Sequence, residues 1–143
     1  MIIPVISGDI REVSTSVLAY VGDAVFELYI RLHVASRKIS KSGTLHKQAI
    51  MHVRAQAQAN AVRVLLPELT EDETMVFRRA KNSNPVSMAK NASPSDYKYA
   101  TGLEAVIGYL YLTDQNERLD HILLRILTIE SALEKGEIEV HGC

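Results

Sequence analysis

The sequence predicts an all-α protein that forms a single domain. Its 143 residues, 47% hydrophobic and 23% charged, are enough for one globular domain with a hydrophobic core. Apolar residues return every three or four positions along almost the whole chain, which is the helical period. No segment alternates convincingly between apolar and polar residues, as a half-buried strand would. We therefore expect one helical domain over residues 1–143.

The first half of the chain predicts two long helices. The first covers residues 12–35, where apolar side chains recur at helical spacing: Val13, Val17, Val21, Val25, Leu28 and Leu32. The polar segment 36–43 is a loop. Thr44 suits the N-cap of a second helix that runs to about Leu66 and stops at Pro67.

The second half predicts three further helices. Thr70 and Glu73 match a capping box, which begins a helix that lasts to about Lys81. Residues 82–95 (NSNPVSMAKNASPS) form a long loop, and such loops in small domains are either disordered or functional. Helices over 96–113 and 117–134 complete the fold, and Gly136 begins the C-terminal tail.

Several classes of protein and site are disfavoured. No apolar run approaches the roughly 18 to 20 residues of a membrane helix, and the N-terminus does not resemble a signal peptide, so we expect a cytoplasmic protein. The single cysteine, Cys143, excludes an internal disulfide and a cysteine-based zinc site. His46 and His52 are not spaced as zinc ligands on one helix face. The chain also has no phosphate-binding glycine loop and no serine nucleophile elbow.

A formal net charge of −1 conceals a basic middle section. Residues 28–103 hold 12 of the 16 Lys and Arg residues but five acidic residues, and residues 28–67 hold no acid at all. The acid-free stretch contains Arg31, Arg37, Lys38, Lys41, Lys47, Arg54 and Arg63. It could present a positive surface to a polyanion, or it could be an ordinary solvated helix face.

Two acidic residues stand among apolar neighbours. Asp23 lies in VLAYVGDAVFEL and Glu104 in ATGLEAVIGYLYL, and burying an ionised carboxylate is unfavourable unless it is paired or ligates a metal. Glycines accompany both, Gly22 in the first helix and Gly102 and Gly108 in the other, and glycine allows a second backbone to approach closely. Helices packed there would bring the carboxylates together around a hard cation such as Mg²⁺. The alternative is that each acid pairs with a buried arginine or caps a neighbouring helix.

Glu27 is a weaker candidate for the same site. It lies one helical turn after Asp23 and shares its face. It also stands four residues before Arg31, and this spacing favours a surface ion pair over metal binding.

The segments around these acids resemble the signature motifs of the ribonuclease III family. The motifs are LAYVGDAVFEL (18–28) and TGLEAVIGYLYL (101–112). Together with FRRAKN (77–82) and SDYKYATGLEA (95–105), they resemble the compact bacterial branch called Mini-ribonuclease III, which lacks the double-stranded-RNA-binding domain. The resemblance extends from about Ser16 to Leu127, and it is the order and spacing of the motifs that makes it specific.

The resemblance implies a single ribonuclease III catalytic domain, active as a homodimer, that cleaves double-stranded RNA with Mg²⁺. It implies 5′-phosphate and 3′-hydroxyl ends and a role in maturation of the 23S ribosomal RNA precursor, with ribosomal proteins or the assembling ribosomal subunit as further partners. Asp23 and Glu104 correspond to the essential aspartate and glutamate of the family, as catalytic residues and metal ligands. Two further acids of full-length relatives are replaced by Ala19 and Thr101.

A chain without a separate RNA-binding domain must hold the duplex with the catalytic domain itself, through backbone phosphates and 2′-hydroxyls. The candidates lie at the start of the second predicted helix and around the 82–95 loop. They are His46, Lys47, Arg78, Arg79, Lys81, Asn82, Lys90, Tyr97 and Lys98. For His46 and Lys47, ordinary polarity at a helix start is an equal alternative.

A second interpretation is a nuclease-inactive helical dimer that binds RNA and acts in ribosome assembly. The presence of Asp23 and Glu104 favours the enzyme, since a binding protein has no reason to bury two acids. A purely structural bundle would leave the acid-free stretch 28–67 without a role.

Overall fold

The computed structural model describes residues 6, 8–37, 55–83 and 93–140, and all regular structure in these ranges is helical. The α-helices are α1 (Thr15–Ser36), α3 (Ala55–Leu65), α4 (Glu71–Lys81), α5 (Pro94–Leu112) and α6 (Asn116–Glu134). Two short 3₁₀ turns, η1 (Ile10–Glu12) and η2 (Leu66–Glu68), precede α1 and α4. The predicted all-α class is confirmed. None of these helices combines the length and the apolar character needed to cross a membrane.

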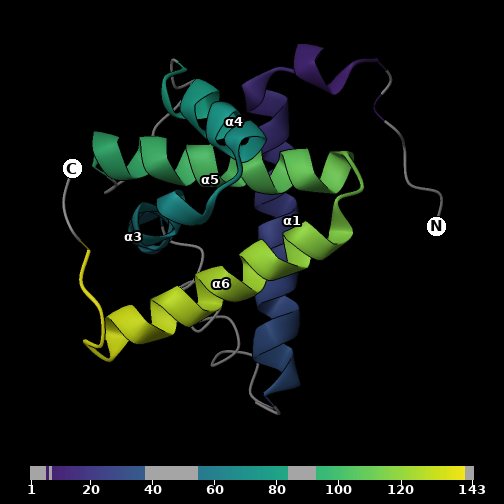
Figure 1. The fold of residues 1–143 in the computed structure, drawn as a ribbon. Coiled ribbons are helices and arrows are strands. Elements are labelled where there is room, and N and C mark those ends of the chain that lie inside the picture. Colours follow the sequence, from purple (N-terminus) through teal and green to yellow (C-terminus); the bar gives the residue numbers. More distant parts are fainter. Residues whose placement is uncertain (1–5, 7, 38–54, 84–92, 141–143) are drawn as a thin grey trace.

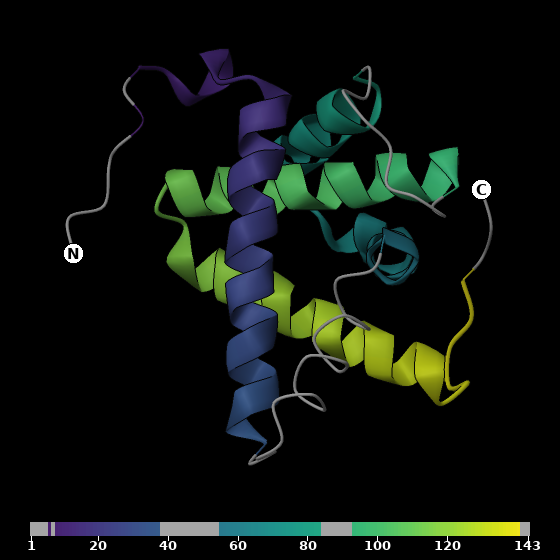
Figure 2. The same cartoon turned by 180° about the vertical axis from the view of Figure 1, so that it is seen from behind.

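Helix α5 lies at the centre of the fold. Helix α1 crosses it steeply on one side, α4 packs along one flank, and α3 and α6 lie on the other (Figures 1 and 2). The middle of α5 is largely apolar, and Leu103 and the run Ala105–Gly108 are buried on either side of Glu104. This burial fixes the position of the α5 backbone against α1, which carries the first acidic motif.

Helix α1 begins three residues later than predicted. Ser14 is its N-cap, and the Ser14 hydroxyl accepts a hydrogen bond from the backbone N–H of Val17 at 3.3 Å. The preceding residues form η1, which Asp9 caps through the N–H of Arg11. The helix then runs unbroken to Ser36, and the stripe facing the core consists of Leu18, Gly22, Phe26, Ile30 and Val34.

The helix predicted over 44–66 can be compared in its second half only, because residues 38–54 lie outside the described part. There α3 ends at Leu65, and Pro67 stands in η2, where its missing N–H costs no helical hydrogen bond. The predicted capping box is confirmed. The N–H of Glu73 donates to the Thr70 hydroxyl at 3.2 Å, and the N–H of Thr70 donates to the Glu73 carboxylate at 3.0 Å.

Helix α5 begins at Pro94, two residues before the predicted start. Ser93 is the N-cap, whose hydroxyl accepts from the N–H of Asp96 at 3.0 Å, and proline is well suited to the first helical position. The loop predicted to reach Ser95 is therefore two residues shorter at this end. Helix α6 begins at Asn116, one residue earlier than predicted, after a turn in which Asp114 has a φ of 56°.

Two arginines of α6 bind η2 and the start of α4. Arg118 donates two hydrogen bonds of 2.8 Å to the buried Glu73 carboxylate and a third, also 2.8 Å, to the carbonyl of Glu68. Arg125 forms a bidentate pair with the Glu68 carboxylate at 2.8 and 2.6 Å. Because Glu73 is also a member of the capping box, one carboxylate links α4 to α6.

Candidate active site

The crossing of α1 and α5 is a backbone contact that two glycines make possible. A Cβ atom on Gly22 would lie 1.7 Å from the carbonyl oxygen of Glu104 and 2.8 Å from the N atom of Gly108. A Cβ on Gly108 would lie 2.0 Å from the carbonyl oxygen of Leu18. No side chain fits at either position, so glycine sets how closely the two helices approach.

This crossing brings the carboxyl groups of Asp23 and Glu104 into hydrogen-bonding contact. Burial, the hydrogen bond with Asp23 and the charge of Asp23 together raise the pKa of Glu104 to about 9. At neutral pH Glu104 therefore holds a proton unless a cation compensates the second negative charge. The predicted meeting of the two acids is confirmed.

Two features of the prediction are wrong. Asp23 was expected to be buried but is exposed. The expectation failed because apolar neighbours such as Tyr20 and Leu28 lie on the outer side of α1 and do not pack into the core. Glu104 is half-buried. Gly102 does not serve the α1 crossing. A Cβ there would lie 2.5 Å from Cδ2 of Phe77, so this glycine makes room for α4.

The donor set of the pair is suited to a hard cation. Two carboxylates that share one proton offer only oxygen ligands, which Mg²⁺ prefers. In the parts of the chain that the structure describes, no third His, Cys, Asp or Glu joins them. Ala19 and Thr101, one turn before the two acids, add no charge. Glu27 pairs instead with Arg31, which confirms the predicted surface ion pair.

Comparison with known proteins identifies the family. The model of the Ribonuclease III domain matches residues 16–115, which include both acids. The chain belongs to the ribonuclease III family. This ribonuclease III domain is 42% identical to Mini-ribonuclease 3 of Clostridium tetani over 135 residues, 94% of this chain and 89% of that protein. It is 40% identical to Mini-ribonuclease 3 of Thermoanaerobacter sp. over 122 residues, which cover 85% and 86% of the two chains.

The fold comparison agrees with the sequence comparison. A crystal structure of a protein from Fusobacterium nucleatum superimposes with a TM-score of 0.75 at 32% identity, covering 92% of this chain and all of that one. Family and relatives together make this chain an endoribonuclease of the ribonuclease III type.

The predicted RNA-binding residues within the described ranges lie at the C-terminal end of α4 and in the N-terminal part of α5. Arg78, Arg79, Asn82 and Lys98 are exposed on α4 and α5 or at their ends. Tyr97 is half-buried and lies seven residues before Glu104, which places both on one face of α5. The predicted His46, Lys47 and Lys90 lie outside the described residues.

Lys81 has surroundings that the sequence did not reveal. Its Nζ lies 5.0 Å from the centre of the Tyr99 ring, and the Arg63 guanidinium lies 4.5 Å from the same ring. Lys81 was predicted from the sequence as an RNA-binding residue, whereas Tyr99 was not predicted. No local signal could have found it, because the three residues come from three different helices.

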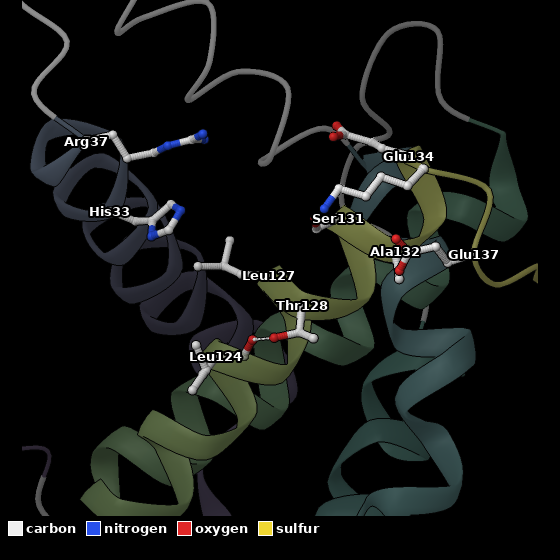
Figure 3. Close-up of a pocket in the computed structure, with 10 residues that line it drawn as sticks. His33, Arg37, Leu124, Leu127, Thr128, Ser131, Ala132, Glu134 and Glu137 are labelled. Atoms are coloured by element: carbon white, nitrogen blue, oxygen red, sulfur yellow. Dashed lines mark hydrogen bonds between the residues drawn. The ribbon is translucent and has the colours of Figure 1, made fainter.

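An open pocket of about 810 Å³ lies apart from the carboxylates, between the C-terminal half of α1 and α6. In Figure 3, His33 of α1 and Arg37, the C-cap of this helix, face Leu127 and Ser131 of α6. His33 lies ten residues after Asp23, or about 15 Å further along the helix axis. Neither Asp23 nor Glu104 lines this pocket, so it is separate from the candidate active site.

Proposed function

We propose that this chain is an Mg²⁺-dependent endoribonuclease that cleaves double-stranded RNA, with Asp23 and Glu104 as its catalytic residues and metal ligands. The observation that carries the proposal is the contact of these two carboxyl groups at the glycine-lined helix crossing. Membership of the ribonuclease III family supports the substrate class.

In the proposed mechanism Asp23 and Glu104 would hold Mg²⁺, which when bound would lower the pKa of a water molecule and offset charge on the phosphoryl oxygens. Asp23 is exposed, so its carboxylate is accessible to the RNA backbone and to solvent. Glu104 is half-buried on the central helix, and the crossing at Gly22 and Gly108 holds it at a fixed distance from α1. Rigid support of this kind is what precise positioning of a scissile phosphate requires. The products expected of the family are 5′-phosphate and 3′-hydroxyl ends.

The proposed RNA surface combines exposed cations and polar side chains from α4 and α5 with three residues outside the described ranges. It comprises Arg78, Arg79, Lys81, Asn82, Tyr97 and Lys98, together with His46, Lys47 and Lys90. Most of these residues carry positive charge, so binding should follow the phosphate backbone and weaken as salt rises.

We also propose a homodimer that forms through the outer face of α1. This face exposes Val17, Tyr20, Leu28 and Leu32, and Tyr20 is 81% and Leu28 60% accessible. An apolar stripe of this length is typical of an interaction surface. Asp23 lies on the same helix, so pairing α1 with its copy would place the two active sites on either side of the interface and allow each to cut one strand.

The proposed cellular role is maturation of the 23S ribosomal RNA precursor in the cytoplasm, beside ribosomal proteins or the assembling subunit. It is supported by the similarity to the Mini-ribonuclease 3 relatives and by the family resemblance of the motifs.

A gel assay tests the enzyme. The purified chain is incubated with a duplex taken from a 23S precursor stem, in Mg²⁺ or in EDTA, alongside Glu104→Gln and the control Glu27→Gln. We expect cleavage by wild type and by the control in Mg²⁺ only, with no cleavage by Glu104→Gln. A duplex that is retarded but intact in every lane would identify an RNA-binding module and contradict the proposal.

Light scattering after size-exclusion chromatography tests the dimer. Leu28→Glu should convert the dimer to a monomer, because it puts a charge in the apolar interface. Met75→Glu on α4 is the matched control, since Met75 is also 60% accessible. A monomeric wild type, or a dimer that survives Leu28→Glu, would contradict the proposed interface.

A further inference from the structure

Tyr99 of α5 lies where three helices meet and interacts with a cation from each of two neighbours. The Arg63 guanidinium of α3 is 4.5 Å from its ring centre, and Nζ of Lys81, the last residue of α4, is 5.0 Å from it. The Phe77 ring packs beside it at 5.7 Å and an interplanar angle of 60°. Both cations are within the range of a cation–π attraction.

The first cation, Arg63, is fixed and neutralised. Its side chain is 13% accessible, and Nη1 donates to the Asp96 carboxylate at 2.9 Å and to the Asn60 side chain at 3.1 Å. Nη2 donates to the Ser95 hydroxyl at 2.9 Å. Arg63 therefore serves as a rigid support for one side of the ring, and Asp96 compensates its charge.

The second cation, Lys81, keeps its charge. Within the described ranges no carboxylate pairs with it, and the partner that holds it is the Tyr99 ring. An aromatic face attracts an ammonium group without neutralising it, and it leaves N–H donors free for an anion. The cluster of Arg63, Asp96 and Lys81 thus carries one uncompensated positive charge, located on Lys81.

Holding the Lys81 side chain against the Tyr99 ring reduces the conformational entropy that is lost when Lys81 binds a ligand. A free lysine side chain loses rotamer freedom when it is immobilised, and a side chain that is already ordered loses less on binding. The cluster is also connected to the active-site helix, since Phe77 packs against both Tyr99 and Gly102, and Gly102 stands two residues before Glu104.

We propose that Tyr99, supported by Arg63, is a positioning residue that pre-orders Lys81 to bind a phosphate of the RNA backbone. The inference rests on the proposed function, because it assumes that duplex RNA is the ligand. It assigns Tyr99, and the Arg63–Asp96 ion pair beside it, a role in RNA binding.

A double-mutant cycle of duplex binding, measured by fluorescence anisotropy in EDTA over a series of salt concentrations, tests the inference. Tyr99→Leu and Lys81→Gln should each weaken binding several-fold and lower the salt slope by about one, as expected for one lost phosphate contact. The double variant should bind like Lys81→Gln alone. Tyr99→Phe, which keeps the ring, should bind like wild type. An effect of Tyr99→Leu that persists in full in the Lys81→Gln background would overturn the inference.

A spectroscopic measurement on the wild type does not depend on whether Tyr99→Leu folds. The ring should shift the ε-methylene proton resonances of Lys81 upfield, and duplex RNA should perturb these resonances at low salt. Resonances of Lys81 at random-coil positions would overturn the inference. If wild type binds duplex but Lys81→Gln binds equally well, this inference fails alone; if wild type does not bind duplex, the proposed function fails with it.

Discussion

Gly22→Ala tests how the fold builds the active site. A methyl group there would meet the Glu104 carbonyl oxygen at 1.7 Å and its carbon at 2.6 Å, where ordinary contacts begin near 3.4 Å. The three nearest atoms all belong to the backbone, so no side-chain rotation can relieve the overlap with them. Helices α1 and α5 must therefore separate by roughly 1.5 Å, which would pull Asp23 away from Glu104.

The expected cost follows from two opposing effects. Overpacking a core costs about 1 to 3 kcal/mol and sometimes more, while alanine gains about 1 kcal/mol over glycine in a helix. Because the overlap is severe and rigid, we expect a net loss of about 2 to 3 kcal/mol in the free energy of unfolding, or roughly 10 °C in Tm. Misplacing catalytic groups by about 1 Å can cost about 100-fold in rate, so cleavage should fall at least that far.

Urea denaturation and single-turnover cleavage, measured where the variant is fully folded, check both numbers. Gly102→Ala is the matched control, since its methyl group would meet the Phe77 ring on the α4 side. It should lower stability but leave the Asp23–Glu104 contact in place and reduce cleavage less than tenfold. A Gly22→Ala variant with wild-type stability and cleavage would refute the account of the crossing.

Three other outcomes are expected. Arg118→Ala should cost about 3 kcal/mol in urea denaturation, because it strands the buried Glu73 carboxylate, and should leave kcat unchanged; a loss below about 0.5 kcal/mol would contradict this. In EDTA, stability should fall as pH rises from about 4.5 towards 9, because folding raises the pKa of Glu104 from 4.5 to about 9. The slope is at most about 1.4 kcal/mol per pH unit and should vanish in Glu104→Gln. Glu27→Gln should leave cleavage unchanged and alter stability by about 0.5 kcal/mol or less, since its pair with Arg31 is on the surface.

Local signals in the sequence were enough to predict most of the fold. The Thr70–Glu73 capping box starts α4 where expected, because both halves of that motif lie within four residues. Gly22 and Gly108 were correctly associated with a close helix crossing, since glycine inside an apolar helix is costly unless another backbone needs the space. Helix ends were less predictable. Ser14 and Ser93 act as N-caps, so α1 starts three residues later and α5 two residues earlier than predicted.

Features that depend on tertiary contacts could not be predicted. Apolar neighbours suggested that Asp23 was buried, but the sequence cannot distinguish a core-facing valine from the exposed Tyr20. Gly102 was assigned to the same crossing as Gly108, and only the placement of Phe77 on α4 shows that it serves another helix. The contact of Arg63 with Tyr99 likewise joins α3 to α5, and the residue spacing within either helix does not reveal it.

The proposed active site requires Asp23 and Glu104 to hold a divalent cation together. Binding of Mn²⁺, which takes the same oxygen ligands as Mg²⁺, can be titrated directly by electron paramagnetic resonance on folded wild type, Asp23→Asn, Glu104→Gln and the control Glu27→Gln. We predict that wild type and the control bind the ion, and that Asp23→Asn and Glu104→Gln each weaken binding at least tenfold. Equal affinity in all four proteins would contradict the assignment of Asp23 and Glu104 as metal ligands, because the ion would then bind elsewhere.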